Sequence, residues 1–179
     1  MRTGIILGLA GLVVLGLAGV SRTVSTPGAP LASLIPQEVT GKRRELLLTA
    51  ISELGHVGGN KYWADAQPAF VGTSEDWCGG FVLWALHQVG LARDRGWIIG
   101  VGFILAPPFD LPTTNDPKPG DIIYIDQPNQ HQGMVLRIEG NTIHTIDGNS
   151  GNIVTINDRQ RSSITAFFSI EPLIQQGIA

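Results

Sequence analysis

Cys78 is the single cysteine among the 179 residues, and its neighbours are those of a nucleophile. It lies in the run Trp77-Cys78-Gly79-Gly80, at the start of an apolar stretch that predicts a helix. Unpaired N–H groups and the helix dipole favour a thiolate at such a position. Gly79 leaves room for a substrate, and the Cys78 amide could stabilise an oxyanion. A buried cysteine with no chemical role is the alternative interpretation.

A thiol nucleophile needs a base, and the chain offers four histidines. His87 lies nine residues after Cys78 on the same predicted helix, so it is about 13.5 Å further along the axis and on the opposite face. His144 lies inside a predicted strand, where a packed or half-exposed histidine is the ordinary case. His56 falls in a loop, and the sequence does not place it. His131 begins a predicted strand, which can hold it rigidly opposite a helix start, so it is a candidate for the base.

A third group must orient the imidazole, and two candidates follow His131 in the segment IDGNSG. Asp147 and Asn149 share strand parity, so both side chains can point the same way. Either could accept a hydrogen bond from the imidazole and thereby fix its tautomer. An ordinary Asp-Gly-Asn turn is the alternative reading of this segment.

The elements that must position these residues fall into two groups. Helical patterns come first, at residues 42–54 and from Asp76, the expected cap, to Gly90. Strand patterns follow at residues 121–126, 134–138, 142–147, 153–156 and 164–170. We expect irregular structure at 61–75 and a long connection at 91–117 that borders the site. Helices followed by an antiparallel sheet predict an α+β fold.

The N-terminal part has a different composition from the rest. Residues 4–20 carry no charge and include five glycines, which is typical of a signal peptide or a weak membrane anchor rather than a core helix. We therefore divide the chain into a signal or anchor at 1–22, a proline-containing linker at 23–38 and a folded domain at 39–174. This division predicts export to the periplasm or the cell exterior, with membrane contact through the N-terminal segment.

The charge balance excludes several classes of function. All fifteen acidic residues, but only ten of the twelve basic ones, follow residue 37. An acidic body argues against nucleic-acid binding, which requires clusters of Lys and Arg. The phosphate-loop and dinucleotide-binding glycine patterns are absent. We expect a monomer that uses no metal and no cofactor.

Three motifs in order resemble the CHAP family, the cysteine, histidine-dependent amidohydrolase/peptidases: WCGGFVLWAL, PKPGDIIYID and HQGMVLRIEGNTIHTIDGNSG. The resemblance covers about residues 43–172. It implies a papain-like α+β fold in which Cys78 is the nucleophile and His131 the base. Asp147, which stands where this family commonly has Glu, is the first choice to orient His131, and Asn149 is the second.

The resemblance also implies the substrate. Members of this family hydrolyse peptidoglycan, at the sugar–peptide amide or at a bond within the stem peptide or cross-bridge. We assign Asp76, Trp77 and Gly79, beside the nucleophile, to substrate binding. A phage-type endolysin with a signal-anchor segment and a secreted bacterial wall enzyme or effector both fit. The alternatives are an inactive membrane-tethered binding module and a cysteine amidase acting on a small peptide-like compound.

Overall fold

A computed structural model of the chain describes residues 31–92 and 111–177. The helices are α1 (Gly41–Ile51), α2 (Asn60–Ala66), α3 (Cys78–Gln88) and α5 (Glu171–Gln176), with 3-10 turns at Leu31–Leu34, Pro68–Phe70 and Arg161–Ser163. The strands are β1 (Ile122–Ile125), β2 (His131–Glu139), β3 (Thr142–Asp147), β4 (Thr155–Gln160) and β5 (Ala166–Phe168). The expected segment 1–22, part of the linker and most of the connection 91–117 lie outside the described residues.

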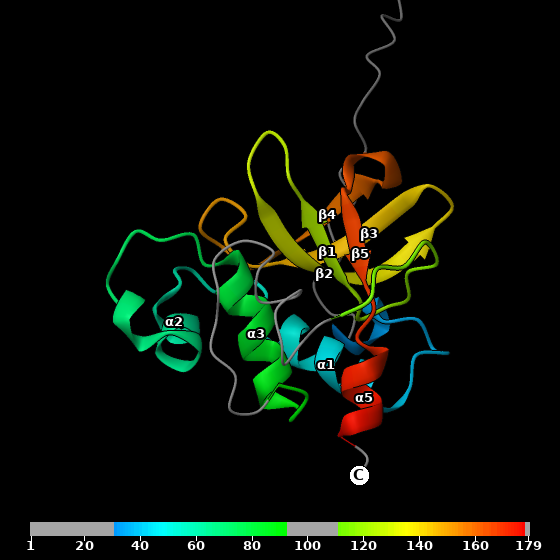
Figure 1. Cartoon of the computed structure of the whole chain (residues 1–179), viewed down its shortest axis with the longest axis horizontal. Coiled ribbons are helices and arrows are strands. Elements are labelled where there is room, and N and C mark those ends of the chain that lie inside the picture. The colour runs from blue at the N-terminus through cyan, green and yellow to red at the C-terminus, as the bar shows by residue number, and fades with distance from the viewer. Residues whose placement is uncertain (1–30, 93–110, 178–179) are drawn as a thin grey trace, which may run out of the picture.

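The five strands form one antiparallel sheet in the order β4-β3-β2-β1-β5. Helices α1, α3 and α5 gather on one side of this sheet (Figure 1), and α3 packs directly on β2 and β3. Alternation along the strands produces two apolar layers, because successive side chains point to opposite faces. On β1, Ile122 joins the large core with the helices, whereas Ile123 joins a smaller cluster on the other face. The predicted α+β class is confirmed.

The segment 61–75, expected to be irregular, contains α2 and a 3-10 turn. Tyr62 and Trp63 are both buried, and Tyr62 stacks on Trp77 with ring centroids 5.1 Å apart. Tertiary burial therefore stabilises this short helix. Its 7 residues are too few to show a helical period in the sequence.

Two expected boundaries also differ from the structure. Helix α3 begins at Cys78 instead of Asp76, and no side chain caps it. The folded part begins before residue 39, because Ile35 is only 2% exposed and belongs to the core. Its apolar side chain had no periodic neighbours in the sequence to indicate burial.

A buried ion pair fastens the two ends of the domain to the sheet. The Arg43 guanidinium of α1 donates to Asp121 Oδ1 over 2.8 Å, and Asp121 is 1% exposed. The same guanidinium lies 3.3 Å from Glu171 at the start of α5. Arg43 thus joins the first helix, the turn before β1 and the last helix.

The apolar N-terminal segment was expected to contact a membrane. Across 31–92 and 111–177, no helix has the length and apolar character that a membrane crossing requires.

Candidate active site

Cys78 is the first residue of α3, and its side chain is largely buried. The amide groups at the start of a helix have no partner within that helix. Gly80 lies close to the Trp63 ring, since a Cβ at this position would be 3.1 Å from a ring carbon. Small residues after the cysteine therefore let α2 approach the start of α3, and they leave the first amides of α3 next to the sulfur.

His131 is the first residue of β2, as expected, and it pairs with Ile125 of β1. The Cys78 side chain interacts with the His131 ring and contributes to raising the pKa of His131. The ring Nε2 lies 3.4 Å from Asp147 Oδ2, at ion-pair distance. Because Nε2 faces the carboxylate, Nδ1 is the nitrogen left for the sulfur. The structure thus brings Cys78, His131 and Asp147 together from α3, β2 and β3.

Asp147 is the last residue of β3 and is completely buried. Its Oδ2 accepts hydrogen bonds from Asn157 Nδ2 over 2.7 Å and from Thr145 Oγ1 over 3.1 Å. Arg159 of β4 donates to the same oxygen. Asp147 Oδ1 is also buried and makes no hydrogen bond among the described residues. The carboxylate is therefore held almost entirely through one oxygen, which is also the oxygen nearest His131.

These contacts set the protonation states of His131 and Asp147. Burial opposes the charge on His131, but its interactions with Asp147 and Cys78 outweigh burial and raise the pKa of His131 to about 9. Burial would likewise raise the pKa of Asp147, but His131 and Arg159 hold that pKa below its usual range. An imidazolium beside the Asp147 carboxylate is therefore the stable state of His131 at neutral pH.

Asn149, the second candidate for orienting His131, is directed elsewhere. Strand β3 ends at Asp147, and Asn149 adopts a left-handed backbone with φ of 57°. Its Nδ2 donates to Asp76 Oδ1 over 2.8 Å. The shared parity expected for Asp147 and Asn149 fails because the chain leaves the strand between them. Asn149 instead ties the turn after β3 to the segment before the nucleophile.

A cleft of about 550 Å³ is lined in part by the residues just before the cysteine, but Cys78, His131 and Asp147 are not among its lining residues. Of the three residues assigned to substrate binding, Asp76 and Trp77 line it, together with His56 and Asn149, whereas Gly79 is buried and does not line it. Trp77 is 3% exposed and donates from Nε1 to Asn152 Oδ1 over 3.2 Å. It therefore presents only an edge to the cleft, and the side chains around it are mainly polar.

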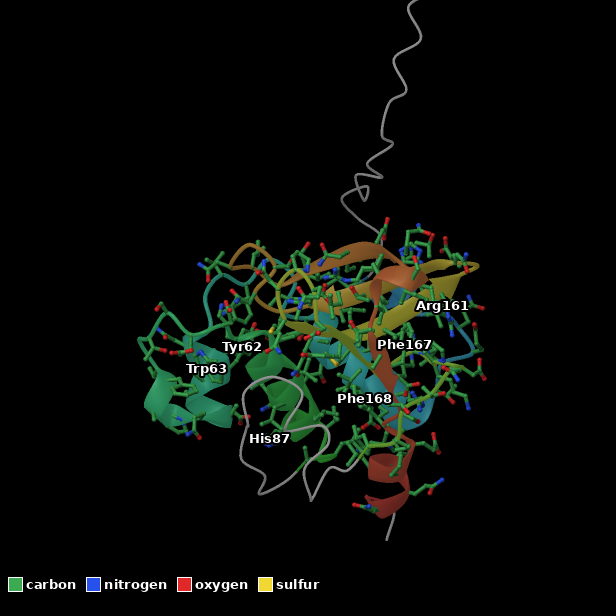
Figure 2. All side chains as sticks on the ribbon, turned by 45° about the horizontal axis from the view of Figure 1, so that its top comes forward. Tyr62, Trp63, His87, Arg161, Phe167 and Phe168 are labelled. Atoms are coloured by element: carbon green, nitrogen blue, oxygen red, sulfur yellow. The ribbon has the colours of Figure 1, made fainter. Side chains whose placement is uncertain are left out.

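His87 and His144 contact carboxylates other than Asp147, whereas His56 lines the cleft. Figure 2 shows His87 at the C-terminal end of α3, where its Nδ1 lies 2.6 Å from Asp65 Oδ2. His144 Nδ1 lies 2.5 Å from Asp158 Oδ1 on β4. Across the described ranges, no group of three His, Cys, Asp or Glu side chains is arranged to hold a metal ion.

Arg159 and Gly133 belong to the site but were not identified from the sequence. Arg159 follows the strand expected at 153–156, and β4 extends further, to Gln160. A longer strand would have placed Asn157 and Arg159 on one face, since they alternate. Gly133 follows His131 by two residues, and its proximity to Asp147 depends on the pairing of β2 with β3.

No protein-family model matches the chain, and no curated protein matches it. The crystal structure of the NlpC/p60 domain of the peptidoglycan hydrolase SagA is similar, with a TM-score of 0.44 and 17% sequence identity. That similarity covers 71% of this chain and 97% of the other.

Proposed function

We propose that the chain is a cysteine-dependent amidohydrolase or peptidase that cleaves amide bonds in peptidoglycan. The observation that carries this proposal is the contact series from Cys78 through His131 to the buried carboxylate of Asp147. A thiol, an imidazole and a carboxylate in this order form the nucleophile, base and orienting group of acyl transfer. The CHAP-like motifs support the choice of peptidoglycan.

The proposed reaction proceeds through a thioester. The Cys78 thiolate attacks the amide carbonyl carbon, and the carbonyl oxygen becomes an oxyanion near the first amides of α3. His131 gives its proton to the leaving amine as the C–N bond breaks. It then takes a proton from water, which attacks the thioester carbon. The carboxylic acid leaves, and Cys78 again faces a protonated His131.

Asp147 keeps His131 ready for both steps. Its carboxylate faces Nε2, which fixes the ring orientation and directs the other nitrogen to the sulfur. The carboxylate also stabilises the imidazolium, whose proton the leaving amine requires.

Digestion of purified cell walls tests the function. The full-length protein is incubated with sacculi, and mass spectrometry of the released fragments identifies the bond that is cut. We expect fragments with new amine ends from the wild type and none from a folded Cys78→Ala control. If small peptide amides are hydrolysed while the sacculi remain undigested, the protein is instead an amidase for small compounds. Sacculus binding without cleavage, and without thiol labelling of Cys78, would indicate a binding module.

We also propose export, on the basis of residues 4–20. Cell fractionation should recover the protein in the membrane or the periplasm. A full-length form that moves from membrane to periplasm uncleaved would favour the endolysin type with a signal anchor. A soluble full-length product in the cytosol would contradict export.

A further inference from the structure

Building on the proposed function, we infer that Arg159 is a positioning residue that keeps Asp147 ionised while His131 gives up and regains its proton. Arg159 donates from a terminal guanidinium nitrogen to Asp147 Oδ2. It also donates from Nε to Thr145 Oγ1 over 3.1 Å. Thr145 in turn donates to the same carboxylate oxygen, so the three side chains form a closed set of hydrogen bonds.

The strand register explains how this set forms. Strand β4 pairs with β3 so that Arg159 is opposite Ile143, and Asp147 is opposite Thr155. The arginine side chain therefore runs along the sheet, past Thr145, to reach the carboxylate at the end of β3. Its side chain is 20% exposed while that of Asp147 is completely buried. The charge of Arg159 thus reaches the site from β4, whereas the thiol belongs to α3.

The need for a second cation follows from the reaction. A buried carboxylate without a counter-charge is strongly disfavoured and takes up a proton instead. His131 can be the counter-charge only while it is protonated, and it becomes neutral once the leaving amine takes its proton. The charged and titratable groups that face Asp147 are His131 from β2 and Arg159 from β4, with Cys78 of α3 beyond the imidazole. Arg159 retains its charge throughout, so Asp147 remains an anion when His131 must recover a proton from water.

Loss of Arg159 should therefore change the pH dependence as well as the rate. In Arg159→Met, Asp147 should protonate at higher pH, because an adjacent guanidinium ordinarily lowers a carboxyl pKa by one to three units. The acidic limb of activity should move up by about one pH unit. The alkaline limb should not move to lower pH. Asp147 is ionised again at alkaline pH, and the variant lacks the positive charge of Arg159 near His131. A general loss of stability would lower activity without moving the acidic limb alone.

The experiment measures two rates across pH 4 to 10 on the full-length protein. One is kcat and KM for a soluble wall-derived peptide, and the other is alkylation of Cys78 by iodoacetamide, which needs no substrate. Arg159→Met should lower kcat about tenfold or more near neutral pH with little change in KM, and should move the acidic limb of both profiles upward. Arg159→Lys keeps the charge, so its pH profiles should return most of the way to those of the wild type. It also provides a test if Arg159→Met does not fold.

Arg137→Met is the matched control, since Arg137 pairs with the exposed Glu139 at the far end of β2. It should leave both profiles unchanged. The inference is overturned if Arg159→Met keeps the wild-type acidic limb, or if Arg137→Met shifts it equally. A wild type that is alkylated with the expected profile but cleaves no wall peptide would refute the proposed substrate. The role of Arg159 would then still be decided by the alkylation data.

Discussion

Asp147 Oδ1 occupies the space that a side chain on Gly133 would need: a Cβ at residue 133 would lie 1.9 Å from this oxygen. The second residue after His131 must therefore be glycine for the buried carboxylate to sit beside the imidazole. A larger residue would have to displace Asp147 or separate β2 from β3.

Gly133→Ala should accordingly lower activity by more than about tenfold, because an ångström of misplacement at a reacting group is costly. Gly177→Ala, at the end of α5 and away from the site, is the matched control and should behave as wild type. Activity and the thermal unfolding midpoint are measured together. A folded Gly133→Ala protein with full activity would show that the contact is not needed.

Cys78→Ala should abolish hydrolysis, a loss of about a thousandfold or more, while the fold is retained. Removing one sulfur from the first residue of α3 leaves the aromatic packing around α2 and α3 in place. Cys78→Ser should be nearly as inactive, because the site is arranged for a thiolate and a hydroxyl ionises poorly. Fragment release from sacculi and circular dichroism check both variants. Wall digestion by the alanine variant would end the assignment of the nucleophile.

His131→Ala should be as inactive as Cys78→Ala, and the double variant no worse, because the two groups act as one unit. His87→Gln and His144→Gln should keep most activity, since these rings contact Asp65 and Asp158 instead. The pKa of His131 is raised to about 9, so wild-type activity that depends on the imidazolium should decline as pH rises through that value. The raised pKa of His131 also stabilises the folded state. This contribution is complete below about pH 6.5, the pKa of an unperturbed histidine. It is lost as the pH rises through the folded-state pKa of about 9. A pH–rate profile that falls already near pH 6.5 would contradict this coupling.

Asp147→Asn should lower activity by about a hundredfold and move the alkaline limb to lower pH, because the imidazolium loses its carboxylate. Asn149→Ala should lower activity only a few-fold and leave the alkaline limb in place, because Asn149 donates a hydrogen bond to Asp76 and not to the imidazole. Profiles of kcat against pH separate the two. Equal and mild losses from both changes would mean that neither residue orients His131.

Arg43→Met should destabilise the fold by about 3 kcal/mol, since it leaves the carboxylate of Asp121 buried without its ion-pair partner. Lys42→Met removes an exposed pair with Glu45 on the same helix and should change stability by less than about 1 kcal/mol. Denaturant unfolding measures both. Similar midpoints for the two variants would show that the buried pair contributes little.

Much of the site could be predicted from local sequence. The apolar stretch after Cys78 predicts a helix that carries the thiol, although the start expected at Asp76 lies two residues before the observed one. Alternation predicts the strands that carry His131 and Asp147. These patterns depend on backbone period and on neighbouring residues, so they can be recognised without knowing the fold. The α+β class follows from the order in which the patterns occur.

Only the tertiary structure decided which side chains meet. Asp147 faces His131 because β2 and β3 pair in one register, while Asn149 leaves that face through a left-handed turn. Arg159 reaches Asp147 because β4 extends beyond its apolar residues and pairs with β3. Contacts of this kind join residues that are distant in the chain. Their geometry depends on strand register, turn conformation and the packing of α2 and α3, none of which any single stretch of sequence determines.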